Sequence, residues 1–172
     1  MSKENLSLMA QYNIWATQRL SVSLEKVSDE DFYKDVGLYF KSIFGTLNHL
    51  LVGEHYLWYP RFAEGISPNL KLNDVIEEDR SLCLTQLRQK SQQWIAFIDT
   101  IDDGRLQGSL RYTRVNGEQL TLPFMPTLFH VFNHGTHHRG QVTAAMTAMG
   151  YECPELDLVY MLAEIERHQK QC

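Results

Sequence analysis

Hydrophobic residues recur along most of the chain at the three- and four-residue spacing of amphipathic helices. One such stripe lies within residues 6–24, a second within residues 42–62 and a third within residues 73–101. A fourth helix is predicted to begin after Pro126 and to end near Gly150, because proline favours the first turn of a helix and glycine favours the position just after its last turn. The pattern therefore predicts a largely helical protein.

Residues 106–124 depart from this helical spacing. Apolar and polar residues alternate there as in a strand, and the alternation is broken by Asn116-Gly117, a strong signal for a tight hairpin turn. We expect a short β-hairpin or an extended loop in this segment, and a last helix over about 155–167. Four long helices with a hairpin between the third and the fourth predict an all-α fold class, a four-helix bundle. No repeat or linker divides the chain, so residues 1–172 are predicted to form a single domain.

Composition narrows the function classes. Hydrophobic residues make up 44% of the 172 residues and charged ones 22%, as in globular proteins. The 16 basic and 21 acidic residues give a net charge of −5 without a basic run, so no nucleic-acid partner is expected. The three cysteines are scattered, which favours a reducing compartment. Neither a signal peptide nor an apolar run of about 18 residues is present, and we expect a cytoplasmic protein with no membrane partner.

Histidine is the unusual residue type of this sequence. Four of the seven histidines lie between residues 130 and 138, and His130, His134 and His138 are spaced by four. On an α-helix, residues four apart differ by about 40° in direction and by about 6 Å in height, so their side chains share a face. Two imidazoles placed in this way can bind one metal ion through bonds of roughly 2.0–2.1 Å.

The helical wheel selects two members of this cluster. With Pro126 at zero, the apolar residues of the fourth helix centre near ~160°, His138 falls near ~120° and His134 near ~80°. The other two histidines lie further toward the flank of the helix. Spacing alone leaves two interpretations open: a metal ion shared by His134 and His138, or two core histidines satisfied by hydrogen bonds. A shared ion would offset the cost of desolvating two neighbouring imidazoles.

A catalytic metal ion needs a third protein ligand and an open coordination position. The second helix contains His49 and His55, and small residues surround His49 at helical spacing. The wheel does not place His49 in the core, because the main apolar stripe of that helix lies on its other side. The residue pattern therefore leaves the third ligand open.

The segment from Asn133 to Gln141 resembles the signature of the DinB/YfiT-like superfamily. It reads Asn-His-Gly-Thr-His-His-Arg-Gly-Gln, and segments of the first helix, residues 43–50 and residues 154–158 resemble that family as well. The resemblance implies a four-helix bundle with an up-down-down-up arrangement and one divalent metal ion. Carried over residue by residue, its metal ligands are His49, His134 and His138.

The same resemblance suggests an activity. Three histidines leave a coordination position free for water or substrate, and imidazole ligands fit Zn²⁺ and Ni²⁺ without separating them. We expect a metal-dependent enzyme, a transferase that uses a low-molecular-weight thiol or a hydrolase, which acts on a small-molecule substrate and forms a homodimer. Its pocket is expected between the first, second and fourth helices, with Tyr12 or Trp15 in the wall. The alternative is a non-enzymatic dimeric bundle with a structural metal or structural histidines, which acts through a protein partner.

Polar residues near the motif carry further expectations. Gln141 is expected to hydrogen-bond a metal-bound histidine, because such imidazoles usually donate their second N–H to a partner. Arg139 is expected to pair with an acid such as Asp157. Glu54 is expected to be either a buried partner of an arginine or an exposed charge.

Overall fold

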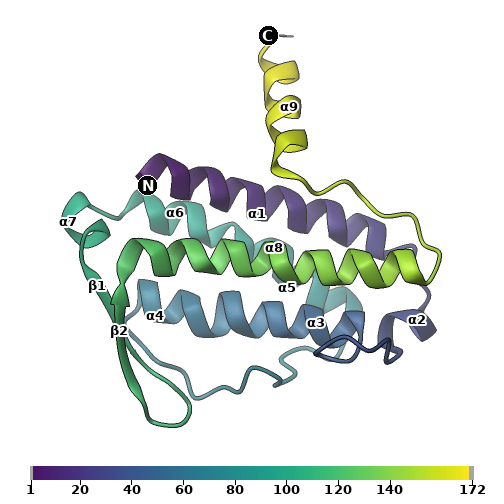
Figure 1. Ribbon diagram of the computed structural model, residues 1–172, viewed down its shortest axis with the longest axis horizontal. Helices are drawn as coiled ribbons and strands as arrows, with labels where there is room; N and C mark the ends of the chain where they lie inside the picture. The colour runs from purple at the N-terminus through teal and green to yellow at the C-terminus, as the bar shows by residue number, and fades with distance from the viewer. Residues whose placement is uncertain (1, 171–172) are drawn as a thin grey trace.

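The computed structural model describes residues 2–170 of the chain. Four helical rods lie side by side and form the bundle (Figure 1). The rods are built from α1 (Lys3–Leu24), from α3 (Ile43–Leu50) with η1 (Leu51–Trp58) and α4 (Tyr59–Ala63), from α5 (Arg80–Ser91) with α6 (Gln93–Asp99), and from α8 (Phe124–Ala148). In Figure 1, α1 and α8 run from left to right and the other two rods run from right to left. The predicted four-helix bundle and its up-down-down-up arrangement are confirmed.

The second rod is continuous from Ile43 to Ala63, as the spacing predicts, and changes its helical winding on the way. The Ser42 side chain caps it by accepting a hydrogen bond of 3.0 Å from the Gly45 N–H. Its middle part, η1, is a π-helix of eight residues, a winding that occurs often at functional sites. Pro60 lies in the first turn of α4, where a missing N–H is tolerated.

The third rod begins later than predicted. The sequence favours a start at residue 73, but α5 begins at Arg80, and the Asp79 side chain caps it by accepting from the Leu82 N–H. The preceding segment is held as a loop by the buried Asn48 of α3, whose side-chain oxygen accepts from the N–H groups of Ile76 and Glu77. These bonds to a distant side chain take the N–H groups of Ile76 and Glu77 away from helical bonds.

The predicted hairpin is present between the third and fourth rods. Strands β1 (Ser109–Thr113) and β2 (Gln119–Pro123) are antiparallel, with Leu110 opposite Leu122. The turn contains Gly117 at a φ of 85°, a conformation that glycine adopts without strain. The hairpin passes directly into α8, which therefore begins at Phe124, two residues before Pro126.

Two short helices and a projecting one complete the chain: α2 (Asp29–Tyr33), α7 (Asp103–Leu106) and α9 (Leu158–Gln169). The last helix begins three residues later than the expected 155 and points away from the bundle (Figure 1). Within α9, Met161 is buried. Within residues 2–170, no helix has both the length and the apolar composition needed to cross a bilayer.

The two larger apolar clusters of the core lie on either side of a polar zone, and a small third cluster packs α1 against α9. One cluster is built around Phe62, Trp94 and Phe132, and the other around Leu24, Leu51 and Met146. In three of the rods, the residues between the clusters are buried and polar. These are Asn13 in α1, Glu54 in η1, and His138 and Arg139 in α8. The fold therefore places polar chemistry at the middle of the bundle.

Candidate metal centre

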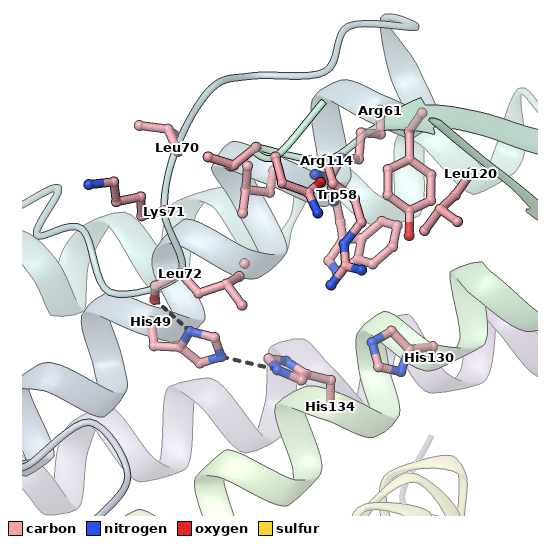
Figure 2. Close-up of a pocket in the computed structure, with 15 residues that line it drawn as sticks. His49, Trp58, Arg61, Leu70, Lys71, Leu72, Arg114, Leu120, His130 and His134 are labelled. Atoms are coloured by element: carbon pink, nitrogen blue, oxygen red, sulfur yellow. Dashed lines mark hydrogen bonds between the residues drawn. The ribbon is translucent and has the colours of Figure 1, made fainter. Parts of the chain in front are cut away.

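Three imidazoles meet between the second and fourth rods. His49 comes from the last turn of α3, and His134 and His138 come from successive turns of α8. The Nε2 atom of His134 lies 3.1 Å from that of His49 and 3.0 Å from that of His138. Figure 2 shows the imidazoles of His49 and His134 facing each other. The structure thus brings together the three residues that the resemblance implies as metal ligands.

In His49 and His138, the hydrogen bond made by Nδ1, the ring nitrogen that points away from the cluster, shows which nitrogen carries the proton. The Nδ1 of His49 lies 2.8 Å from the carbonyl oxygen of Leu72, which can only accept, so this nitrogen donates. The Nδ1 of His138 lies 2.7 Å from the side-chain oxygen of Gln141 and donates in the same way. Both Nε2 atoms therefore present a lone pair to the centre of the cluster, which is the form that binds a metal ion.

The three converging nitrogens cannot satisfy one another by hydrogen bonding. With two Nε2 atoms as acceptors, one proton on His134 Nε2 can be donated to only one of them. A cation at the centre would satisfy all three. Ligand atoms of a tetrahedral ion with bonds of 2.0–2.1 Å lie about 3.3–3.4 Å apart, within a few tenths of an ångström of the two distances observed. The donor set and its spacing therefore fit a divalent ion.

Burial keeps these imidazoles neutral. Burial, together with the neighbouring histidines, lowers the pKa of His134 to about 3. Burial likewise lowers the pKa of His138 to about 4, against the hydrogen bond to Gln141. The pKa of His49 is lowered by burial as well, and its bond to Leu72 opposes the shift. At neutral pH a metal ion would therefore not have to displace a proton from an imidazolium.

A pocket of about 670 Å³ opens onto the cluster, within the range of small-molecule sites. Figure 2 shows His49 at one end of it, His130 at the other and His134 between them. The walls come from η1 and α4, from the 64–79 loop, from the hairpin and from α8. The lining residues are His49, Gly53, Leu57, Trp58, Arg61, Leu70, Lys71, Leu72, Tyr112, Arg114, Val115, Asn116, Leu120, His130 and His134.

Comparison with known proteins shows the family of this chain. A model of the DinB family matches residues 1–169. The chain belongs to the DinB family. It is 25% identical over 153 residues to the protein DinB of Bacillus subtilis strain 168, a match that covers 86% of this chain and 87% of that one.

A solved structure supports the fold of this DinB-family chain. YfiT from Bacillus subtilis, described as a probable metal-dependent hydrolase with an unusual four-helix bundle topology, superposes with a TM-score of 0.68. The superposition covers 88% of this chain and 91% of YfiT at 20% identity. At this identity the likeness shows the bundle fold that this DinB-family member shares with YfiT.

The prediction that Tyr12 or Trp15 of α1 lies in the pocket wall is wrong. Tyr12 donates to the carbonyl oxygen of Leu156 at 2.8 Å, and Trp15 donates to Glu164 of α9 at 2.8 Å. Both side chains therefore face the C-terminal segment of the chain. The hairpin and the 64–79 loop take their place in the wall, because both fold over the histidine face of the bundle.

Of the predictions for Gln141 and Arg139, the first is confirmed and the second is wrong. The expected hydrogen bond between Gln141 and a histidine of the cluster is present, to His138. The expected pair of Arg139 with Asp157 is wrong. Arg139 is buried and donates to the side-chain oxygens of Asn13 and Thr136.

Glu54 takes the first of its two expected roles, a buried acid beside an arginine. Asn13 donates to it at 2.9 Å. Burial raises the pKa of Glu54, and the charge of Arg139 and the hydrogen bond from Asn13 oppose the rise. Gly135 provides the space, because a Cβ at this position would lie 2.4 Å from the Glu54 Oε1. We call Asn13, Glu54 and Arg139 the polar cluster.

The remaining histidines lie outside the triad. His130 lines the pocket and packs against Trp58 with ring centroids 5.8 Å apart. His55 is buried beside Glu54, and burial lowers its pKa to about 3. His137 is exposed. Sequence reasoning missed the pocket residues Trp58 and Arg61, and only their position one or two turns beyond His55 on the same rod hinted at them.

Proposed function

We propose that this chain is a metal-dependent enzyme that acts on a small molecule in the 670 Å³ pocket. In the proposal, His49, His134 and His138 hold one divalent ion, Zn²⁺ or Ni²⁺, and the pocket supplies the open coordination side. One observation carries the proposal. The Nε2 of the half-buried His134 lies 3.0–3.1 Å from those of the buried His49 and His138, whose lone pairs are directed inward, at the wall of a cavity large enough for a substrate.

The bound ion would act as a Lewis acid that lowers the pKa of a coordinated water or thiol. The chain's own residues perform the remaining tasks. The Leu72 carbonyl and Gln141 fix the orientation of two ligand rings. The apolar side chains Leu57, Leu70 and Leu120 line the cavity and reduce its water content.

His130 is the proposed proton acceptor in the pocket. Its ring centroid lies 5.6 Å from that of His134. Burial lowers its pKa, so the ring is neutral at pH 7 and able to accept a proton from a water or thiol held beside His134. The reaction types that fit are transfer of a low-molecular-weight thiol to a small electrophile and hydrolysis. A homodimer in the cytoplasm remains part of the proposal.

Removal and return of the metal test this function. The protein is stripped with a chelator, its fold is followed by circular dichroism, and thiol transfer and hydrolysis are screened before and after Zn²⁺ or Ni²⁺ is restored. We expect a folded metal-free protein without activity and recovery with about one ion per chain. Unfolding on removal of the metal would support a structural metal instead. Activity that survives in the fully stripped protein would contradict the proposal.

A further inference from the structure

A buried guanidinium without an acidic partner lies in the wall of the same pocket. Arg61 is 8% exposed, and its Nε has no hydrogen-bond partner among the described residues. The guanidinium carbon lies 4.8 Å from the ring centre of Trp58 and 4.5 Å from that of Tyr112. Figure 2 shows Arg61 and Trp58 across the pocket from His130 and α8. The pocket therefore contains a fixed positive charge held between two aromatic rings.

The rings of Trp58 and Tyr112 partly compensate the charge of Arg61 but accept no hydrogen bond from its N–H groups. Aromatic faces attract a cation placed over them, whereas the five N–H groups of arginine lie in the plane of the guanidinium. Burial lowers the pKa of Arg61, and the charge of Arg114 adds to this effect. Within residues 2–170, no carboxylate forms an ion pair with Arg61. An arginine kept in a cavity in this state is prepared for an anion from outside the chain.

The rest of the pocket wall reinforces the preference for an anion. No lining residue in the described part of the chain is acidic, and Lys71 and Arg114 add positive charge near the opening. Arg114 is partly neutralised by Glu118 at 3.0 Å, and both of these side chains are exposed. Between the charges the wall is apolar, at Leu57, Leu70 and Leu120. A cleft of one charge sign with apolar walls concentrates ligands of the opposite sign.

We infer that the pocket selects a small organic acid, with its carboxylate on the Arg61 fork and its apolar body along the leucine wall. This inference rests on the proposed function only for the statement that the other end of the ligand reaches the three histidines. A planar guanidinium matches a carboxylate with two parallel hydrogen bonds. A monoanion suits the site better than a dianionic phosphate, because Arg61 is the one buried cation in this wall.

The test compares two probes of the same shape and different charge. 4-Phenylbutyrate and its neutral amide are titrated calorimetrically into metal-free protein, and inorganic phosphate is tested as a competitor. We expect the acid to bind about tenfold or more tightly than the amide in the parent chain. In Arg61→Gln, the two affinities are expected to agree within about twofold. The control Arg111→Gln removes the same charge from an exposed neighbouring position of β1 and is expected to keep the preference.

Other outcomes of these titrations would overturn the inference. No measurable binding of the acid to the parent chain, or an acid preference that survives Arg61→Gln, would overturn the inference. Competition by phosphate as effective as that by the acid would overturn the choice of a carboxylate. If circular dichroism shows that Arg61→Gln does not fold, Arg61→Lys replaces it. That variant keeps the charge without the planar fork, and it is expected to weaken binding of the acid while leaving the amide unchanged.

Repeating the titration after Zn²⁺ loading separates this inference from the proposed function. An acid preference that appears only with Zn²⁺ and does not depend on Arg61 would place the carboxylate on the metal and overturn the inference. An Arg61-dependent preference in a protein that takes up no metal would leave the inference standing and overturn the proposed function.

Discussion

Two polar sites occupy different faces of α8, about 100° apart around the helix, because consecutive residues serve different sites. His134 and His138 belong to the candidate metal centre, whereas Gly135 and Arg139, one residue further along, belong to the polar cluster. Both sites lie between the two apolar clusters of the core. The side chains of the polar cluster are almost fully buried, whereas the metal centre opens onto the 670 Å³ pocket.

The two sites differ in how their polar atoms are satisfied. In the polar cluster, Asn13 links the two charged residues, because it donates to Glu54 and accepts from Arg139. The Nε of Arg139 has no hydrogen-bond partner among the described residues. In the metal centre, two inward Nε2 atoms are acceptors and the protein supplies at most one proton between them. A site whose acid and base both come from the chain contributes to stability, and a site that lacks a positive partner points to a ligand. Changes in the two sites should therefore affect different measurements.

The largest expected effect comes from the polar cluster. Glu54→Leu removes the acid and leaves Arg139 buried beside an apolar side chain. We expect the free energy of unfolding to fall by about 3–5 kcal/mol, as when a buried charge loses the opposite charge near it, measured by urea denaturation of metal-free protein. The double variant Glu54→Leu/Arg139→Met should recover much of the loss. A loss below about 1 kcal/mol in Glu54→Leu would mean that the cluster is not a stabilising unit.

Gly135→Ala tests the space that the cluster needs. The new methyl group would lie 2.4 Å from Glu54 Oε1 and 2.9 Å from Arg139 Nη1, so we expect a loss of about 1–3 kcal/mol in urea denaturation. Gly140→Ala on the same helix is the matched control, because its methyl group would meet nothing within 4 Å. There, the better helix propensity of alanine should stabilise the protein by about 0.5–1 kcal/mol. Equal effects at both positions would contradict the close approach at Gly135.

Gln141→Leu should affect the metal centre and leave the fold intact. The substitution removes the acceptor that fixes the ring of His138. Zn²⁺ affinity should fall by about 10–100-fold, the usual effect of losing such a partner, as measured by competition with a chromophoric chelator. The urea midpoint of the metal-free protein should change little, since the Gln141 side chain is partly exposed. An unchanged Zn²⁺ affinity would show that Gln141 does not support the site.

The stability of the metal-free protein should also depend on pH, through the histidines that stay neutral in the fold. Unfolded histidines take up protons below about pH 6.5, whereas the folded chain keeps His134 neutral down to about 3 and His138 down to about 4. The unfolded state binds more protons in this window, so stability should fall as the pH drops from 6.5 toward 4. Glu54, with its raised pKa, acts in the opposite direction. If the melting temperature rose when the pH was lowered from 7 to 5, the result would contradict the statement that the buried imidazoles stay neutral.

Local signals in the sequence predict the elements well. The apolar stripe of residues 42–62, the Asn116-Gly117 turn and the long periodic stripe of the fourth helix each depend on residues near one another in the chain, and each element is present. His134 and His138 could be selected by the wheel because both lie on one helix. The start of α5 could not be predicted, because the loop before it is held by Asn48, far away in the sequence.

Contacts between different rods could not be predicted from these local patterns. The helical wheel did not identify His49 as the third ligand, and the resemblance to a known family did. The reason is that the wheel of one helix does not show which of its faces packs against α8. Arg61 and Tyr112 come together only when the hairpin folds over the histidine face. The pocket wall was therefore expected on the wrong helix.

Metal content most directly tests the central claim that His49, His134 and His138 form a metal site. Untagged parent protein, His138→Ala and His137→Ala are incubated with excess Zn²⁺, desalted and analysed for zinc and nickel. His137 is the matched control, since it is the exposed neighbour of His138 on the same helix. We predict about one ion per chain in the parent and in His137→Ala, and less than about a fifth of that in His138→Ala. No metal in the parent, or equal metal in His138→Ala, would contradict the account.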